Sequence, residues 1–362
     1  MATAKRKLMH LAAILVLLVW NNCNGNNGPA GVVAVPAVIV MGDSTVDVGV
    51  NNNIPTVFKA NWPPYGRDFP GQQATGRFCD GMLIPDFIAQ RLGHQAPFQL
   101  AFNDPNAKGA VLLQGINTAS SGGGYWDNTG SGLCFSLSQQ VEWISQWKGN
   151  VTLLVGEASA ASITEQAVFT LSTGSNDWLN SYFVNPSNMQ KYTPSQYTDL
   201  LIGFLQNRLQ DLYNLGARRF AVVSLPPIGC IPLETLLHNT NGKCADDLNN
   251  AAVTFNTALQ SLLSSLQGSM AGTTFVYLDA FTQLYDAFNN PSQFGIVHSP
   301  TADACCHFVG SVPAAGVLCN GDSPVCANAD EYLFWDAFHP TQFFNQKVAD
   351  VFYGILSSAM GF

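Results

Sequence analysis

Five short runs of apolar and β-branched residues alternate along the chain with longer segments of helical periodicity. The runs are nearly continuous instead of alternating between polar and apolar positions, which is typical of strands buried on both faces of a parallel sheet. The sequence therefore predicts a central sheet of five mostly parallel strands. The runs occupy residues 34–44, 111–120, 167–177, 218–227 and 273–280.

Amphipathic helices are predicted between and after these strands, because apolar residues recur there every three or four positions. Strands alternating with helices predict an α/β fold with three layers, helix, sheet and helix. Neither an internal repeat nor a Pro/Gly linker divides the chain, so residues 31–362 are expected to form a single domain. The predicted helices are 84–93, 138–147, 195–216, 246–267 and 341–356.

The first 30 residues have the features of a secretory signal peptide. Lys5, Arg6 and Lys7 precede a short apolar stretch at 8–20, and a polar stretch follows. A membrane-spanning helix needs about 20 apolar residues, so a signal anchor fits less well. We expect residues 1–30 to be a signal peptide with an uncertain cleavage site, and the mature protein to be secreted without a transmembrane anchor.

Cysteines and one sequon agree with export. Eight cysteines would remain after signal removal, an even number that suggests disulfides, with buried free thiols as the alternative. Cys230 and Cys244 bracket a short loop and are the best candidates for a bridge. The last four cysteines, within 305–326, are expected to staple the loop that precedes the C-terminal motif. Asn150 begins an N-x-T sequon and is the glycosylation candidate.

Composition excludes one class of partner. The 362 residues are 47% hydrophobic, and 15 Lys and Arg against 24 Asp and Glu give a net charge of −9. Basic residues do not cluster after residue 7, so the chain lacks the positive surface that binds a phosphate backbone. Nucleic acid is therefore not expected as a partner.

Polar or glycine-rich turns follow the first three predicted strands, at 42–44, 120–124 and 174–177. In open parallel sheets, ligands bind outside the carboxyl ends of the strands. The three turns are therefore expected to converge on one crevice.

Ser44 is the candidate nucleophile in that crevice, and a serine hydroxyl needs a base to accept its proton. His339 is the candidate base, because Asp336 lies three residues before it and could hold Nδ1 so that Nε2 faces Ser44. The backbone N–H groups of Ser44 and Gly122 and the side-chain amide of Asn176 could bind the oxyanion that forms during acyl transfer.

Each of these residues also has an ordinary structural explanation. Ser44 could serve simply as a turn residue, and Asn176 could serve simply as a helix cap. Asp336 with His339 could be a surface pair or half of a metal site. Their common placement at strand ends or near the chain's end favours a site. The motifs of α/β-hydrolase elbows, P-loops and HExxH zinc enzymes are missing, and a dinucleotide site has little support. Neither a cofactor nor a metal is expected.

Six sequence blocks, in family order and spanning about residues 35–357, resemble the plant GDSL esterase/lipase family within the SGNH hydrolases. The resemblance implies a flavodoxin-like α/β/α domain and serine ester hydrolysis without a cofactor. It matches Ser44 to the nucleophile, Gly122 and Asn176 to the oxyanion hole, and Asp336 with His339 to the rest of the triad. The blocks are MGDSTVDVGVNNN (41–53), PPYGRDFPGQQATGRFCDG (63–81), GINTASSGGGYWD (115–127), STGSNDW (172–178), LPPIGC (225–230) and DAFHP (336–340).

Three departures from the family pattern leave every reacting atom in place. Met41 stands where members usually have Phe, and Val50 stands where they have Asn. Residues 119–124 read ASSGGG, where members often have ASGGAG or ASAGAG. The extra glycine is expected to make the loop around Gly122 more pliable.

Together these observations predict a secreted serine esterase or lipase, extracellular and in the apoplast or cell wall if the source is a plant. Its substrates would be small-molecule, lipid or acylated-polysaccharide esters, cleaved through an acyl-enzyme on Ser44. The alternatives are an acyltransferase that uses the same acyl-enzyme, a catalytically silent extracellular binding protein on the same fold, and a metal-dependent hydrolase.

Overall fold

The computed structural model describes residues 35–94, 96, 99–238, 240–300, 304–307 and 318–362. The expected signal peptide, residues 1–30, lies outside these ranges, so it stays a prediction. No helix within the described ranges is both long and apolar enough to cross a bilayer.

One five-stranded sheet organises the described residues, with all four strand pairings parallel. The strand order β2-β1-β3-β4-β5 is that of flavodoxin-like folds and confirms the predicted class. The strands are β1 (Val38–Gly42), β2 (Gly115–Asn117), β3 (Val168–Ser172), β4 (Arg219–Val223) and β5 (Thr274–Leu278).

A row of large apolar side chains sets the register of the sheet. Phe169, Phe220 and Phe275 are direct partners on β3, β4 and β5, and the last two rings stack with centroids 4.6 Å apart. Ile39 on β1 continues the row between Phe169 and Ile116. Because the neighbouring strands are in register, β1, β2 and β3 end at one edge of the sheet, and the turns after them meet there.

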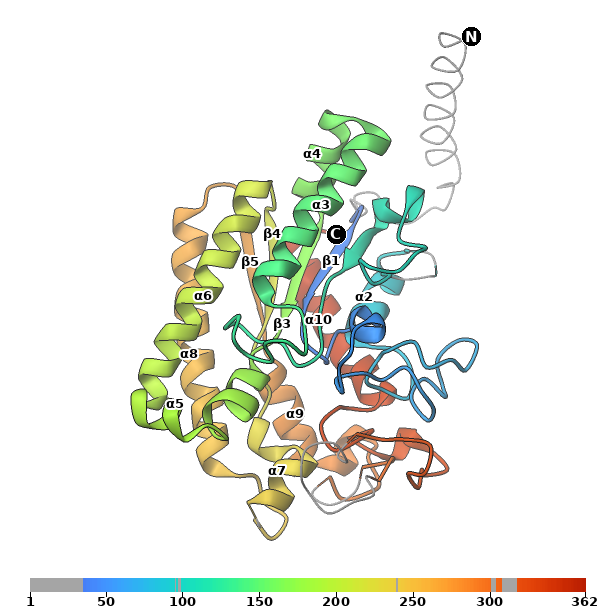
Figure 1. Cartoon of the computed structure of the whole chain (residues 1–362), viewed down its shortest axis with the longest axis vertical. Helices are drawn as coiled ribbons and strands as arrows, with labels where there is room; N and C mark the ends of the chain where they lie inside the picture. The colour runs from blue at the N-terminus through green and yellow to red at the C-terminus, as the bar shows by residue number, and fades with distance from the viewer. Residues whose placement is uncertain (1–34, 95, 97–98, 239, 301–303, 308–317) are drawn as a thin grey trace.

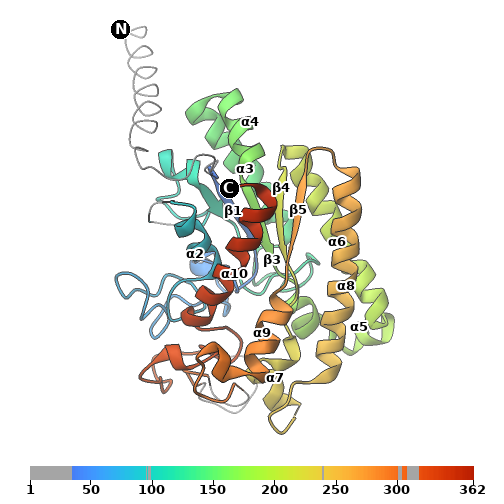
Figure 2. The ribbon, with the colours of Figure 1, turned by 180° about the vertical axis from the view of Figure 1, so that it is seen from behind.

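Helices cover both faces of the sheet and confirm the three layers (Figures 1 and 2). On the face seen in Figure 1, α3 packs against α6, and α6 packs against α8. On the face seen in Figure 2, α10 crosses the sheet and packs against α2. Their bounds are α2 (Ile84–Arg91), α3 (Leu137–Val155), α6 (Pro194–Leu215), α8 (Asp246–Ser269) and α10 (Gln342–Met360).

Several elements differ from the predictions. The run 111–120 gives only the short strand β2, because the 3-10 helix η2 takes up Gly109–Gln114. Helix α3 continues to Val155, and Gly156, with φ of 82°, separates it from α4. The helices that the periodicity did not predict are α4 (Glu157–Gln166), α5 (Pro186–Lys191), α7 (Pro232–Leu237) and α9 (Ala280–Asn289). The remaining turns are η1 (Val50–Asn53), the π-helix η3 (Asp177–Tyr182), η4 (Ile228–Cys230), η5 (Pro291–Phe294) and η6 (Ala329–Glu331).

Three disulfides stabilise loops within the described part of the chain. Cys230 is bonded to Cys244, the pair proposed from spacing. The last four cysteines pair as Cys305–Cys326 and Cys306–Cys319, and both bridges lie in the segment before α10. Cys79 and Cys134 are free thiols. Asn150 is an exposed residue of α3, so its sequon lies on a helix and not on a loop.

The segment after β1 and the segment before α10 lie side by side at the carboxyl edge of the sheet, as both views show (Figures 1 and 2). Trp62 Nε1 donates to the Cys319 carbonyl, and Arg67 Nη1 donates to the Cys326 carbonyl. These contacts bring residues from opposite ends of the chain to one place.

Candidate active site

Ser44 stands on a sharp turn directly after β1. Gly42 has φ of 149°, and a Cβ at this position would lie 2.0 Å from the Ser172 carbonyl oxygen of β3. The Gln140 side chain of α3 bonds both the N–H and the carbonyl of Gly42, each at 2.9 Å. Only glycine allows this close approach, so the end of β1 is fixed and Ser44 faces the crevice at the edge of the sheet.

His339 and Asp336 meet Ser44 in this crevice. His339 Nε2 lies 2.9 Å from Ser44 Oγ, and Nδ1 lies 2.8 Å from Asp336 Oδ1. Asp336 is fully buried, and His339 is 6% exposed. This burial contradicts the alternative explanation that the two form a surface pair. The three side chains have the hydrogen-bond order of a serine, a base and an orienting carboxylate.

The environment of Asp336 favours its charged form. Burial alone would raise the pKa of Asp336, but the nearby His339 imidazole and hydrogen bonds from His339, Tyr65 and the Phe338 N–H together lower it. A buried carboxylate that stays ionised can accept the Nδ1 hydrogen and leave Nε2 free to accept a proton.

The Gly122 turn is supported from the loop after β1. Asp47 Oδ2 accepts the Ser121 N–H at 2.9 Å, and Asn51 Nδ2 donates to the Ser121 carbonyl at 2.9 Å. Gly122 itself has φ of 86°, and a Cβ there would lie 2.4 Å from the Phe58 ring. These bonds counter the pliability expected from the extra glycine.

Asn176 follows β3 and lines the same pocket as Ser44. Its Nδ2 donates to the Gly123 carbonyl at 2.9 Å, and its Oδ1 accepts from Asn180 at 2.8 Å. A primary amide carries two N–H groups, so one remains for a ligand. Asn176 also precedes η3, but its side chain makes no helix-capping bond, which argues against the simple cap explanation.

Asp177 connects η3 to the glycine turn. Its carboxylate accepts the Tyr125 and Trp126 N–H groups and the Thr129 hydroxyl, at 2.7, 3.2 and 2.6 Å. Burial raises the pKa of Asp177 to about 7 in spite of these bonds. Its contacts are those of a residue that supports the turn.

A pocket of about 540 Å³ opens over these groups and is lined by Ser44, Gly122, Asn176 and His339. Most of the wall is apolar, and among the described residues that line it none is Lys or Arg. Its rim carries the exposed side chains Val57, Leu133, Val184 and Leu237, and its buried lining includes Ile228, Leu284, Phe344 and Val348.

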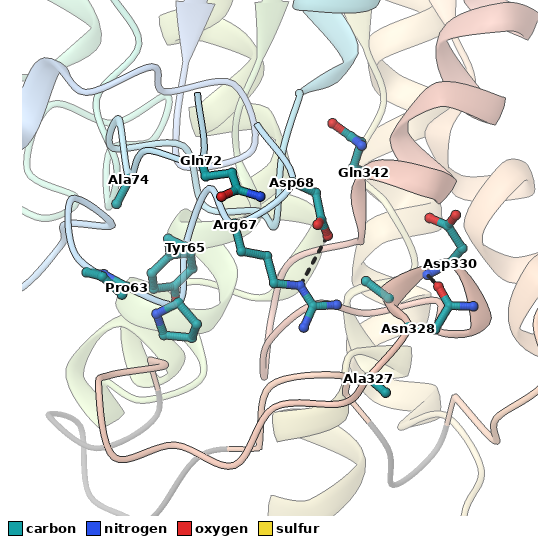
Figure 3. A pocket seen from close by; sticks show the side chains of 12 residues that line it. Pro63, Tyr65, Arg67, Asp68, Gln72, Ala74, Ala327, Asn328, Asp330 and Gln342 are labelled. Carbon is teal, nitrogen blue, oxygen red and sulfur yellow. Dashed lines mark hydrogen bonds and ion pairs between the residues drawn. The ribbon is translucent and has the colours of Figure 1, made fainter. Parts of the chain in front are cut away.

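A second pocket, of about 600 Å³, is lined by Tyr65, Arg67 and Asp68 among other residues (Figure 3). Its wall is mostly polar, and Arg67 is paired there with Asp68 at 3.1 Å. Among the described residues that line it, none is serine or histidine. Within the described ranges, no three His, Cys, Asp or Glu side chains gather as a metal-binding group. The candidate nucleophile Ser44 and the candidate base His339 line the first pocket and not the second.

Sequence reasoning brought Ser44, Gly122, Asn176, Asp336 and His339 together, and the structure places all five around one crevice. It missed the residues that hold them, because each acts through contacts with distant segments. Gln140 lies outside the quoted sequence blocks. Asp47, Asn51 and Tyr65 lie inside the blocks at 41–53 and 63–81, but those blocks do not indicate which distant groups their side chains contact. Asp177 lay within a quoted motif, yet the motif alone did not indicate which loop it supports.

Comparison with known proteins identifies relatives that match most of this chain. The family model described as GDSL-like lipase/acylhydrolase matches residues 38–352. The GDSL esterase/lipase APG of Arabidopsis thaliana is 39% identical over 330 residues, which cover 90% of this chain and 92% of that protein. Two further GDSL esterase/lipases of the same plant are 39% and 40% identical, over 87% of this chain and 88% and 89% of their own lengths. The chain therefore belongs to the GDSL esterase/lipase family and is a carboxylic ester hydrolase.

Proposed function

We propose that this chain is a secreted serine esterase that cleaves carboxylic esters through a Ser44–His339–Asp336 triad and an acyl-enzyme. The observation that carries the proposal is the 2.9 Å separation of Ser44 Oγ and His339 Nε2, two atoms 295 residues apart in sequence. Nothing local in the chain requires this contact, and it is the one that nucleophilic catalysis needs.

The reaction would proceed in two halves. His339 Nε2 accepts the Ser44 proton while Oγ attacks the ester carbonyl, and the leaving alcohol then takes that proton from the imidazole. Water, deprotonated by the same nitrogen, attacks the acyl-enzyme and releases the acid. Asp336 stays ionised throughout and stabilises the imidazolium that forms in each half.

The oxyanion would be bound by the N–H groups of Ser44 and Gly122 and by the free N–H of Asn176. Each donor of this kind contributes about 3 kcal/mol to the stabilisation of a transition state. The hydrogen bonds that fix the Ser121 backbone and the Asn176 amide support this role, since a donor placed in advance needs no reorganisation when charge develops.

The pocket supports an uncharged ester with an apolar acyl group as the substrate. Its buried end, at Leu284, Phe344 and Val348, would hold the alkyl chain away from water. Esters that carry a negative charge would find no Lys or Arg among the described lining residues and would face the acidic side chains of Asp43 and Glu234.

Two of the alternatives keep specific tests. An acyltransferase would use the same residues, and a competing alcohol distinguishes it by the formation of a new ester. A silent binding protein would lack turnover altogether. Secretion, the cleavage of residues 1–30, the single domain over 31–362 and glycosylation at Asn150 remain part of the proposal. N-terminal sequencing of the secreted protein tests the cleavage, and glycosidase treatment tests the glycosylation.

The deciding experiment is Ser44→Ala with p-nitrophenyl butyrate as substrate. We expect kcat/KM to fall by about 10⁴-fold or more, because the nucleophile is removed. Ser261→Ala, on the exposed face of α8, is the matched control and keeps wild-type activity. Full activity of purified, folded Ser44→Ala would overturn the proposal.

A further inference from the structure

Tyr65 reaches the triad from a distant segment. Its hydroxyl oxygen lies 2.7 Å from Asp336 Oδ2, although the two residues are 271 positions apart. The side chain is 1% exposed and comes from the loop between β1 and α2. In Figure 3, Tyr65 stands in the wall of the second pocket, on the segment that also carries Arg67. The bond therefore joins the loop after β1 to the loop that carries Asp336.

The direction of this bond follows from its neighbours. The Cys319 N–H lies 3.3 Å from the Tyr65 oxygen and can only donate, so the hydroxyl accepts there. An ionised carboxylate can only accept, so the hydroxyl hydrogen points to Asp336. Burial raises the pKa of Tyr65 well above its usual value, and the Asp336 charge raises it further, so the hydroxyl keeps its hydrogen. Cys319 is held by its disulfide to Cys306.

The two oxygens of Asp336 are supported differently. Oδ1 accepts the N–H groups of Phe338 and His339 and lies 2.8 Å from His339 Nδ1. Oδ2 lies 2.9 Å from Nδ1, and Tyr65 is its other donor within the described ranges. Removal of the Tyr65 hydroxyl would leave Oδ2 with the imidazole alone.

The ring of Tyr65 is fixed by aromatic contacts that also reach the base. It packs edge-on against Phe78 and Trp335, with centroids 6.0 and 6.3 Å apart. Phe78 in turn lies 4.9 Å from the His339 ring. The hydroxyl is thus held in place by packing as well as by the Cys319 N–H.

We propose that Tyr65 is a positioning residue of the esterase: its hydroxyl, fixed by the Cys319 N–H, holds Asp336 Oδ2 so that the carboxylate orients the His339 imidazole. The inference rests on the proposed function and adds a fourth side chain to the triad. Tyr65 does not touch substrate, so it acts through Asp336 alone.

This role has a consequence for the pH profile. The hydroxyl shares the carboxylate charge with the imidazole, so its removal leaves more of that charge to stabilise the protonated imidazole. The pH of half-maximal kcat/KM would then move upward. Asp43 also faces His339, and Cys79 lies near both Asp336 and Tyr65, but neither changes in a variant at position 65.

Tyr65→Phe tests the proposal with a soluble p-nitrophenyl ester. We expect kcat to fall about tenfold, the loss of one hydrogen bond to a charged group, while KM changes less than about twofold. The half-maximal pH should rise by about half a unit. Tyr182→Phe is the matched control, because it removes the hydrogen bond that the hydroxyl of a buried tyrosine donates to the Tyr192 carbonyl. It should leave kcat and the pH profile unchanged.

A double-mutant cycle separates positioning from general stability. In the Asp336→Asn background, Tyr65→Phe should cause little further loss, because its partner carboxylate is already gone. A tenfold loss in both backgrounds would contradict the proposal. So would an unshifted pH profile in a folded Tyr65→Phe enzyme, whatever its melting temperature.

Replacement of Tyr65 by 3-fluorotyrosine provides a second route if Tyr65→Phe does not fold. The fluorinated phenol keeps the ring and is a stronger donor, so the half-maximal pH should move down instead of up. An unchanged or raised value would overturn the proposal. If Ser44→Ala is inactive and neither Tyr65 variant shifts the profile, only this inference fails; if Ser44→Ala is active, the proposed function itself fails.

Discussion

The two halves of the proposed active site are built in different ways. Ser44, Gly122 and Asn176 each follow closely after a strand of the sheet, so the sheet register positions them. Asp336 and His339 lie on a loop before α10 that forms no part of the sheet. That loop is held by bonds between segments, such as the Trp335 N–H to the His339 carbonyl at 2.7 Å and the Cys306 N–H to the Trp335 carbonyl at 2.7 Å.

The difference indicates where each half is sensitive. Around the strand ends, backbone conformation is critical, and a single Cβ would collide with β3 or with the Phe58 ring. Around the base, side-chain hydrogen bonds and the disulfides Cys305–Cys326 and Cys306–Cys319 are critical. Substitutions should therefore damage the two halves by different routes.

The largest effect is expected at the base. His339→Ala should lower kcat/KM by about 10⁴-fold or more, whereas Asp336→Asn should retain more activity, because the imidazole is still present. His298→Ala, which alters a histidine paired with Glu331 outside both pockets, is the control and should remain active. Steady-state kinetics on a soluble ester measure all three. An Asp336→Asn variant less active than His339→Ala would contradict the roles of His339 as the base and Asp336 as the carboxylate that orients it.

A glycine substitution tests the strand-end half. Gly122→Ala should lower kcat about 100-fold, because its Cβ would collide with Phe58 and move an oxyanion donor. Gly132→Ala is a matched control, since Gly132 has a similar φ of 82° but open space around a new Cβ. Equal losses in both variants would indicate backbone strain and not the displacement of a donor.

The buried end of the pocket should set acyl-chain preference. Leu284→Trp on α9 should lower the ratio of kcat/KM for p-nitrophenyl decanoate to that for the acetate about tenfold, because the larger ring fills the space for the chain. Leu153→Trp, on the 86% exposed Leu153 of α3, should leave this ratio unchanged. An unaltered ratio in Leu284→Trp would place the acyl chain elsewhere.

The smallest effect concerns stability and pH. Burial raises the pKa values of Asp47 and Asp177 to about 7, whereas an unfolded Asp titrates near 3.9. Between these values the folded protein binds more protons than the unfolded chain, so its stability falls as pH rises. The lowered pKa of His94 acts in the opposite direction over part of this range, because there the unfolded chain binds more protons at this histidine than the folded protein does.

Calorimetry should therefore give a melting temperature about 3 °C higher at pH 5 than at pH 8. Asp47→Asn should reduce that difference in melting temperature. Asp199→Asn, at an exposed position of α6, is the control and should leave the difference unchanged. A melting temperature that rises steadily from pH 5 to pH 8 would show that these buried carboxyl groups do not dominate.

The strand-end half could be largely predicted from sequence because its signals are local. A continuous apolar run followed by glycine and a polar residue indicates both a buried strand and the position of its turn, as at Gly42 and Ser44. The short β2 was overestimated, since the apolar run before Gly115 forms a 3-10 helix instead. Short helices such as α5 and α7 escaped prediction because they are only about one and a half turns long.

The base half could be predicted only in part. The three-residue spacing of Asp336 and His339 pointed to their contact, but its supports come from distant segments. Local spacing contains no signal that Tyr65 meets Asp336, that Cys305 pairs with Cys326, or that Asp177 holds the Tyr125 loop. Such contacts depend on how whole segments pack, and only the structure provides that.

The central claim is that Ser44 and His339 act together as nucleophile and base. Its most direct test is to treat the protein with a p-nitrophenyl alkylphosphonate and to locate the adduct by peptide mass spectrometry. The account predicts one adduct, on Ser44, formed at least 100-fold more slowly in His339→Ala. Labelling of another residue, or equally fast labelling of Ser44 without the imidazole, would contradict it.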